Sequence, residues 1–314
     1  SPGGGEAADV NYCLDKLSVA KNDREKEAVL KTVIRRTSAE ENKWFVRILL
    51  KDLKAGFAER TVLHLYHPDA LELFNQTSNL RMVCEELKDP AVRLAPGKDS
   101  VTLFMPVKPM LASRREIDSI ATLFEQGQWV IETKFDGERL QVHKDGSTIR
   151  MFTRNSNDVT KLYGPAVIPN LQNHVSLDSC ILDGEIMVWD QAACRFEDFG
   201  GLRTYALSLR GGDSGGDGLD SQSSMSIATQ CDGGVPGKNL CLVLFDVLLA
   251  EGKSLLMLPL SDRRALLERC VKCVPHVLEL AEQRPVPHTS VQQATDAVVK
   301  ALDAAIDNME EGLM

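Results

Sequence analysis

The sequence lacks a long hydrophobic run, an initiator methionine and an excess of positive charge. No stretch approaches the roughly 18 apolar residues of a membrane-spanning helix, and the glycine-rich residues 1–5 do not resemble a signal peptide. Because the chain does not begin with methionine, we expect it to be a fragment or a processed product. The net charge of −9 argues against a uniformly cationic nucleic-acid-binding surface, although it does not exclude a local basic groove.

The sequence also lacks the cysteine spacing of a zinc site. Cys270 and Cys273 are the only close pair among the eight cysteines, and no second pair or histidine stands at zinc-ligand spacing. The cysteines are scattered through apolar segments, which is typical of reduced, buried cysteines in an intracellular protein. We therefore interpret Cys270 and Cys273 as packing residues.

What is present indicates a helical part followed by a mixed α/β part. The composition, with 43% hydrophobic and 26% charged residues, is typical of a soluble globular protein. Residues 1–10 are expected to be disordered. Prolines and a glycine between residues 88 and 113 predict a connector, with the domain boundary near residue 106. We therefore predict a helical domain over residues 11–106 and an α/β domain over residues 107–314.

The clearest helix signal in the first part is a capping box, formed by Ser38 and by Glu41 three residues later. The helix that follows is predicted to run to about Leu53 and to be closed by Gly56. Further helices are predicted at residues 25–34, at residues 59–66 and from His67-Pro68-Asp69 onward, with proline in the first turn.

Four basic residues on the capped helix fall at spacings of four, four and three, so they share one face. They are Lys43, Arg47, Lys51 and Lys54. Such a stripe is most often a solvated helix face. No acidic residue lies between Lys43 and Lys51, and we therefore interpret the stripe as a surface that contacts DNA phosphates.

The segment Lys134-Phe135-Asp136-Gly137-Glu138-Arg139 organises the second part of the chain. In a strand that begins in the apolar residues before it, Glu132, Lys134 and Asp136 would share one face. Three charged groups on one face suit a site better than a core. Gly137 is expected to let the backbone bend where this strand ends.

Two later strands are predicted to be buried although they carry acids. In residues 180–189, Asp183 and Glu185 are two positions apart and share a face. Burying carboxylates is costly unless a metal or a cation meets them. Residues 240–249 contain Asp246 in an otherwise apolar run, which indicates a hydrogen-bonding or site role.

Turn and capping residues predict the remaining elements of the second part. Asp-Gly at residues 145–146 predicts a hairpin between two alternating segments. Residues 210–238 are rich in Gly, Ser and Asp and are predicted to be a flexible surface insertion. Helices are predicted from Ser261-Asp262 to about Val274 and over residues 290–308, and residues 310–314 are similar to the first half of a strand.

Five motifs stand in the order and at the spacing found in covalent nucleotidyltransferases, and they resemble those of ATP-dependent DNA ligases in particular. They are Lys134-x-Asp136-Gly137-x-Arg139, Arg154-Asn155, Asp183-Gly184-Glu185, Phe245-Asp246 and Glu311-Gly312. Flanking segments, such as residues 44–56, 67–70 and 109–112, are most similar to the eukaryotic members of the family that act in non-homologous end joining. The resemblance covers residues 12–314.

This resemblance implies an all-helical DNA-binding domain, shortened at its N-terminus, followed by a nucleotidyltransferase (adenylation) domain with antiparallel sheets. It also implies that ATP and Mg²⁺ are cofactors. A lysyl-AMP intermediate would pass AMP to a DNA 5′-phosphate, and the DNA 3′-hydroxyl would then displace it. The implied substrate is double-stranded DNA with nicks or broken ends in the nucleus, with no membrane association.

The roles of the family's residues carry over to the matching positions as expectations. Lys134 would be the catalytic nucleophile that attacks the α-phosphate of ATP. The nucleotide would be bound by Glu132 at the adenine amino group, Arg139 and Glu185 at the ribose, Phe245 against the base, Glu311 on the magnesium and phosphate side, Arg154 near the nick, and Thr133 and Phe135, which flank the lysine. Glu185 and Glu311 would also serve the metal.

The sequence departs from the family pattern in several places. The lysine after the Glu-Gly motif, the later Lys-x-Lys strand, the OB-fold domain and the C-terminal modules that bind end-joining scaffold proteins are not in this chain. Residues 210–238 are not part of the core pattern, and the basic residue expected after Glu185 has only Arg195 or Arg203 as a counterpart. We therefore expect the chain by itself to be inactive.

Two alternative functions fit the sequence. An RNA capping guanylyltransferase or an RNA ligase shares the Lys-x-Asp-Gly motif, but the helical first domain and Glu132 favour the DNA enzyme. The other alternative is a catalytically inactive DNA-binding fragment. Its only support is truncation, because residues 12–310 keep every named catalytic residue.

Overall fold

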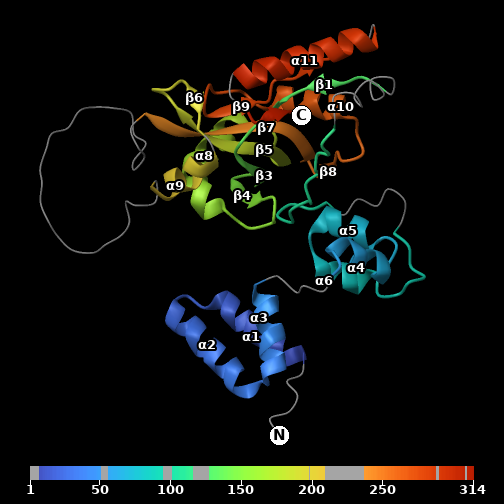
Figure 1. Ribbon diagram of the computed structural model, residues 1–314, viewed down its shortest axis with the longest axis vertical. Helices are drawn as coiled ribbons and strands as arrows, with labels where there is room; N and C mark the ends of the chain where they lie inside the picture. The colour runs from blue at the N-terminus through green and yellow to red at the C-terminus, as the bar shows by residue number, and fades with distance from the viewer. Residues whose placement is uncertain are drawn as a thin grey trace, which may run out of the picture. The chain divides into compact units, whose positions relative to one another are not determined.

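The computed structural model describes residues 7–50, 56–94, 101–115, 127–197, 199–208, 237–287, 290–307 and 310–314. The chain divides after Pro68 into two compact units, and each is described by itself. Figure 1 labels the helices and strands of both units. The predicted domain boundary near residue 106 falls inside the second unit, and the division of the chain into domains at that residue stays a prediction.

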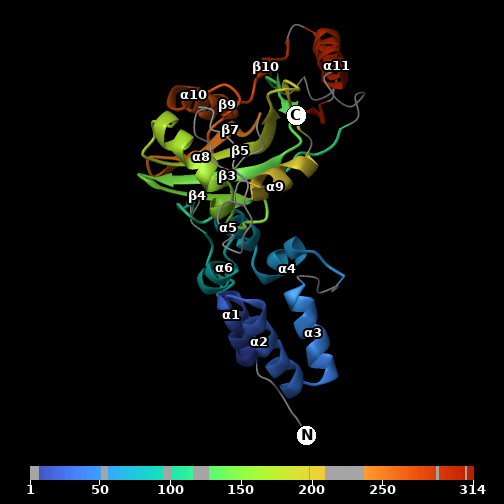
Figure 2. The ribbon, with the colours of Figure 1, turned by 90° about the vertical axis from the view of Figure 1, so that its left-hand side faces the viewer.

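The first unit is helical, as predicted (Figure 2). Its described helices are α1 (Ala7–Val19), α2 (Asp23–Arg36), α3 (Ala39–Leu49) and α4 (Glu59–Tyr66). The capping box of α3 is confirmed, because Ser38 Oγ accepts from the Glu41 amide and the Glu41 carboxylate accepts from the Ser38 amide. α3 ends at Leu49 instead of near Leu53, and residues 51–55 lie outside the described ranges. Residues 7–10 begin α1, so their predicted disorder is wrong, while residues 1–6 are not described.

The second unit begins with two short helices, α5 (Ala70–Thr77) and α6 (Leu80–Glu86). α5 starts at Ala70, after the proline that was predicted to occupy its first turn. Asp69 has a different role, since its carboxylate accepts from Arg93 Nε at 2.8 Å and from the Leu94 amide at 2.9 Å. These bonds tie the segment after α6 to the start of α5.

A central, mainly antiparallel sheet dominates the second unit. Its strand order is β4 (Thr148–Thr153), β3 (Glu138–Asp145), β5 (Ser179–Asp190), β7 (Lys238–Ala250) and β8 (Lys253–Ser254). β6 (Arg195–Phe196) pairs with β5, and β9 (Leu278–Leu280) runs parallel to β7. The predicted hairpin joins β3 to β4, with Gly146 in its turn at a φ of 54°, a region that glycine adopts without steric cost. The hairpin and both acidic strands are confirmed.

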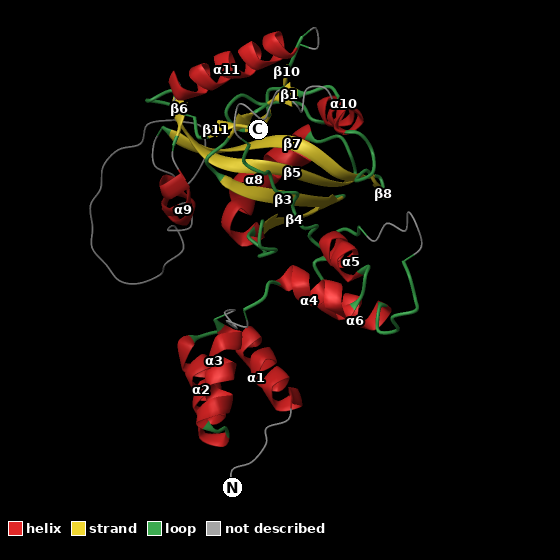
Figure 3. Cartoon of the chain, turned by 45° about the vertical axis from the view of Figure 1, so that its right-hand side comes forward, coloured by secondary structure: helices red, strands yellow, loops and turns green. Residues whose placement is uncertain are grey.

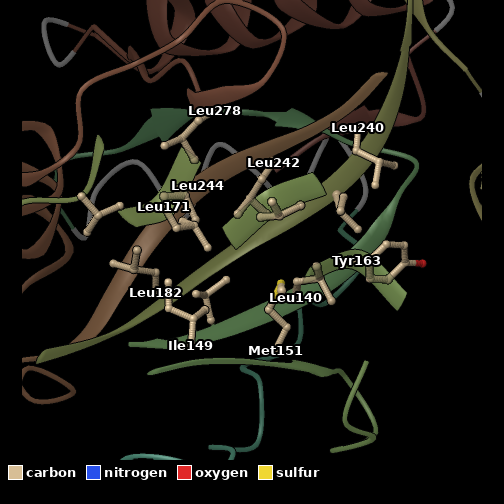
Figure 4. Packing of buried hydrophobic residues seen from close by; sticks show 14 of the residues in the cluster. Leu140, Ile149, Met151, Tyr163, Leu171, Leu182, Leu240, Leu242, Leu244 and Leu278 are labelled. Atoms are coloured by element: carbon tan, nitrogen blue, oxygen red, sulfur yellow. The ribbon is translucent and has the colours of Figure 1, made fainter. Parts of the chain in front are cut away.

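One face of this sheet is apolar, and three of the described helices cover it. They are α8 (Thr160–His174), α9 (Phe199–Ser208) and α10 (Leu260–Cys270). Figure 4 shows Leu140, Leu182 and Leu242 of the strands packed with Tyr163 and Leu171 of α8. Fully burying such a leucine contributes about 1.5–3 kcal/mol relative to leaving it exposed.

All three helices differ from the sequence expectations. α8 and α9 were not predicted, and α8 contains Pro165 and Pro169. α10 ends at Cys270 instead of near Val274, because Val271 takes an extended conformation and forms a bridge with Val175. Tertiary pairing therefore ends α10 one turn earlier than its local pattern indicates.

Two small sheets and α11 (Val291–Asp307) complete the second unit (Figure 3). β1 (Val130–Ile131) pairs with β10 (Arg284–Pro285), and β2 (Thr133–Lys134) pairs with β11 (Gly312–Leu313). α11 packs through Ala294 and Ala301 against Ile131 and Val286. The predicted last strand is confirmed, whereas the strand predicted to carry Lys134 is divided into β1 and β2 at Glu132.

The cysteines are less uniformly buried than predicted. Cys180, Cys241 and Cys270 are buried, but Cys84, Cys194 and Cys273 are exposed. Residues 209–236, nearly all of the predicted insertion, lie outside the described ranges. Within those ranges, no helix combines the length and the hydrophobicity needed to cross a membrane.

Candidate active site

Two glycines allow the strands around Lys134 to approach one another closely. A Cβ atom on Gly137 would lie 2.5 Å from the Ile186 carbonyl oxygen, and one on Gly184 would lie 2.5 Å from the Val243 carbonyl oxygen. Any larger residue would push these backbones apart. The sequence analysis assigned Gly137 to a bend, but the structure gives a different reason for it, which is contact with β5. This contact brings the lysine motif beside the acidic strand.

The face of the central sheet opposite the helices, which we call the polar face, carries a group of polar side chains between two small apolar clusters that include Ile181 and Met187 of β5. Side chains alternate between the two faces of a strand, so Arg139, Gln141 and His143 of β3 lie on this face with Asp183 and Glu185 of β5. In the antiparallel register, Arg139 stands opposite Glu185 and Gln141 stands opposite Asp183. The predicted shared face of the two acids is thus confirmed.

The β3 side chains on this polar face hold the connecting segment over residues 104–110. Their hydrogen bonds, at 2.7–3.1 Å, join His143 Nδ1 to the Phe104 amide, the Gln141 amide group to the Val107 backbone, and Arg139 Nη1 to the Met110 carbonyl. Three alternate residues of one strand therefore fix this segment beside the candidate site.

Arg139 and Asp183 form a bidentate ion pair. Arg139 Nε donates to Oδ1 at 3.0 Å and Nη2 donates to Oδ2 at 2.7 Å. The guanidinium carbon also lies 5.2 Å from the ring centroid of Phe245, within the range of a cation–π contact. Burial raises the pKa of Asp183, and Arg139 acts in the opposite direction. Arg139 is therefore the cation that meets a buried acid of β5.

Lys134 forms an ion pair with Glu311, because the pairing of Lys134 with Gly312 brings β2 and β11 together. The two side chains are 40% and 43% exposed, so solvent and small molecules can reach them. Glu185 belongs to the same cluster. Burial raises the pKa of Glu185 to about 7, while the charges of Arg139 and Lys134 lower it and those of Asp183 and Glu311 raise it. Lys134, Glu185 and Glu311 thus form one electrostatic cluster.

Glu132 lies between β1 and β2 and is half-buried. Its backbone exchanges two hydrogen bonds with Met314, at 3.0 and 2.9 Å. Its carboxylate accepts from Gln283 Nε2 at 2.7 Å. Burial raises the pKa of Glu132, whereas the Gln283 hydrogen bond and the charge of Arg264 lower it. The sequence analysis missed Gln283, since no motif or spacing relates it to Glu132.

The aromatic residues of the motifs lie close to this cluster. Phe245 and Phe135 are partly buried and pack against the same small apolar cluster. Asp246 pairs with Arg263 of α10, whose Nε and Nη2 donate at 2.7 and 2.9 Å. Arg263 was also missed, although Asp246 was expected to have a polar partner. Thr133 pairs with Leu313 in the β2–β11 sheet.

Other predicted positions are exposed residues of the second unit, belong to the first unit or lie outside the described residues. Arg154 is exposed in the turn after β4, and Arg195 is exposed in β6. In the first unit, Lys43 Nζ lies 3.6 Å from Glu40, and Lys43 and Arg47 lie 5.7 and 5.0 Å from the Trp44 ring centroid. Lys51, Lys54 and the side chain of Arg203 are outside the described residues.

Glu185 and Glu311 fit the expected magnesium ion. Mg²⁺ prefers oxygen ligands and is commonly held by one or two carboxylates together with substrate phosphates. Among the described residues, no group of three or more His, Cys, Asp or Glu side chains could hold a metal ion. The remaining ligands would therefore have to come from a nucleotide or from water.

Comparison with known proteins identifies the family. Residues 109–314 match the model described as ATP dependent DNA ligase domain, and residues 2–67 match DNA ligase N terminus. The chain is 40% identical to DNA ligase 4 of Dictyostelium discoideum, with 98% of this chain and 29% of that protein covered. It is 33% identical to DNA ligase 4 of Homo sapiens, with 97% and 31% covered. The chain belongs to the ATP-dependent DNA ligase family.

These comparisons also confirm the finer resemblance of the flanking segments, which is to DNA ligase IV. The solved structure named Pmar-Lig_Pre has a TM-score of 0.56 at 18% identity, and the match covers 98% of this chain and 58% of that one. It supports the predicted fold, a helical N-terminal region and a nucleotidyltransferase-type domain with an antiparallel sheet. The chain spans 29–31% of the length of the two curated relatives named above.

Proposed function

We propose that this chain is the catalytic segment of an ATP-dependent DNA ligase, in which Lys134 accepts AMP from ATP. The observation that carries the proposal is the cluster of Lys134, Glu185 and Glu311 beside the Arg139–Asp183 ion pair. An accessible lysine, carboxylates that suit a divalent cation and a fixed guanidinium are the groups that nucleotidyl transfer to lysine requires.

In the proposed step, Lys134 Nζ forms a bond to the α-phosphorus of ATP and pyrophosphate leaves. The ammonium form of a lysine cannot attack, so the proton must depart first. Glu311, the ion-pair partner of Lys134, is the group placed to receive that proton. Mg²⁺ bound at Glu185 and Glu311 would supply positive charge to the phosphates.

The same geometry supports a binding role for the surrounding residues. The Glu132 carboxylate would accept from the adenine amino group, and Phe245 would stack on the base. Arg139 and Glu185 would hold the ribose. Thr133 and Phe135, which flank the lysine, would also bind the nucleotide, and Arg154 would act near the nick.

For the whole protein, we propose the sealing of nicked or broken double-stranded DNA during non-homologous end joining in the nucleus. The support is that the relatives covering nearly all of this chain are named DNA ligase 4. Scaffold proteins of end joining would bind modules beyond this segment. In the first unit, the basic stripe of Lys43, Arg47, Lys51 and Lys54 would contact DNA phosphates.

The test uses an extended protein, in which this chain continues after Met314 with the sequence that follows the matched segment in the Dictyostelium discoideum relative. The protein is incubated with ATP labelled at the α-phosphate. We expect Lys134→Ala to abolish the covalent label, while the control Lys253→Ala, which changes an exposed lysine of β8, keeps it. A normal yield of label on Lys134→Ala would overturn the assignment, and transfer from GTP instead of ATP would indicate a guanylyltransferase.

The 314-residue chain is measured beside the extended protein. In the family, residues after the Glu-Gly motif contact the α-phosphate, and losing one such charge-stabilising donor costs about 10²–10³ in rate. We therefore expect weak ATP binding but at least about 100-fold slower labelling by the 314-residue chain. Equal labelling of the two proteins would show that the catalytic groups have been misplaced.

A further inference from the structure

We propose that Gln283 is a positioning residue that sets the preference of the site for adenine over guanine. The inference rests on the proposed function, in which Glu132 reads the base. Gln283 Nε2 donates to Glu132 Oε1 at 2.7 Å, although the two residues are 151 positions apart in the sequence.

The register of a small sheet places these two residues together. In the antiparallel β1–β10 pair, Val130 faces Pro285 and Ile131 faces Arg284. Continuing that register by one residue sets Glu132 opposite Gln283. On its other side, Glu132 is held by two backbone hydrogen bonds with Met314. The Glu132 backbone is therefore fixed, and Gln283 fixes its side chain.

Hydrogen-bond chemistry connects this arrangement to base selection. Adenine carries an amino group at C6, which donates, whereas guanine carries a carbonyl oxygen there, which accepts. An ionised carboxylate can only accept. Gln283 takes one lone pair of Oε1 and, among the described residues, no side chain bonds Oε2, so Oε2 is the oxygen with more capacity to accept from a base. A site that directs a fixed acceptor at this position favours adenine and repels the guanine oxygen.

A second group supports the ionised form of Glu132. Arg264 of α10 is only 8% exposed, and its charge acts favourably on the Glu132 carboxylate. Burial and the charge of Asp246 oppose the ionised form of Glu132. The Gln283 donor and the charge of Arg264, whose Nε donates to Glu268 at 2.7 Å, both favour this acceptor form. Among the described residues, Gln283 is the side chain that bonds the carboxylate directly, so it sets how the carboxylate is oriented.

The experiment compares Gln283→Leu, which removes the donor at similar size, with Gln283→Lys, which keeps an N–H donor. Binding of ATP and GTP is measured by calorimetry on the 314-residue chain, and labelling from each nucleotide is measured on the extended protein. We expect Gln283→Leu to reduce the ATP-over-GTP ratio about tenfold, as expected for losing a hydrogen bond to a charged group. Gln283→Lys should keep most of the ratio. The control is Gln292→Leu, which removes a 2.8 Å bond to Asp296 on α11.

A combined variant distinguishes positioning from general stability. Once Glu132→Gln has removed the carboxylate, Gln283→Leu should change the ratio no further. An unchanged ratio in Gln283→Leu, or equal losses for ATP and GTP, would overturn the inference alone. If the unsubstituted protein shows no ATP preference and no label on Lys134, the proposed function fails and the inference fails with it.

Discussion

The two faces of the central sheet come from alternate residues of the same strands, yet their chemistry is opposite. Leu140, Leu182 and Ile186 lie fully buried under the helices on one face. On the other face, Arg139 and Asp183 form an ion pair and Glu185 belongs to the Lys134 cluster. The comparison shows that a candidate site can be built directly on the back of a core, which gives its side chains rigid support.

The polar face carries the larger energetic cost. Burial raises the pKa of Asp183 and of Glu185, which means that their charged forms are disfavoured there. The apolar face has no such cost and contributes to stability through packing. Neighbouring positions on one strand should therefore separate stability from activity when they are substituted.

The largest expected effects come from comparing Leu182→Ala with Glu185→Gln on β5. Leu182→Ala leaves a cavity in the core, so the free energy of unfolding should fall by about 2–5 kcal/mol. Labelling per folded molecule should be retained. Glu185→Gln replaces the carboxyl group with a neutral amide of the same shape, so the free energy of unfolding should change by less than about 1 kcal/mol. Labelling of this variant should fall at least about 100-fold. Urea unfolding and ATP labelling of the extended protein measure both quantities. If Glu185→Gln is less stable than Leu182→Ala and is still labelled, substitutions on the two faces do not separate stability from activity.

A smaller effect is expected at His143, which lies on the polar face but is completely buried. Burial lowers the pKa of His143 to about 3, and the charge of Arg150 acts in the same direction. The unfolded chain, with an ordinary pKa of about 6.5, therefore takes up this proton first as the pH falls. Neutral His143 therefore contributes fully to the free energy of unfolding above about pH 6.5. This contribution is lost progressively toward pH 3, at no more than about 1.4 kcal/mol per pH unit.

The measurement is urea unfolding of the 314-residue chain at pH 7 and pH 5. Relative to His143→Gln, the unsubstituted protein should lose more stability at the lower pH. His276→Gln, at a histidine that is 46% exposed, serves as the matched control. Parallel pH dependence of the unsubstituted protein and His143→Gln would show that His143 does not control this loss.

The smallest expected effect concerns α3, which shows the same contrast on a helix. Phe45 is buried, whereas Lys43 is exposed and Arg47 is partly exposed beside Trp44. If these cations contact phosphates, replacing both by Ala should flatten a log–log plot of DNA affinity against salt by up to about 2 units. The double variant Lys26→Ala/Lys31→Ala on α2 removes two other surface lysines and is the control. Equal slopes for both double variants would support the solvated-face interpretation.

The sequence by itself determined the elements whose signals are local. The capping box of α3, the hairpin at Gly146 and the acidic strands β5 and β7 follow from spacings of a few residues, because turns and strand alternation depend on near neighbours. The motif order also identified Lys134 as the candidate nucleophile. α8 was missed, since prolines inside a helix contradict the local rule and only packing against the sheet overrides it.

Only the tertiary structure decided which polar groups meet. Arg139 pairs with Asp183, Lys134 with Glu311 and Gln283 with Glu132. These pairs form because strand registers bring distant parts of the chain together. Gly137 was assigned to a bend, but position 137 requires glycine because the Ile186 carbonyl oxygen of β5 lies too close for a side chain. The physical reason is common to all four cases: hydrogen bonds and steric limits act over a few ångströms in space, and strand register sets those distances independently of local sequence pattern.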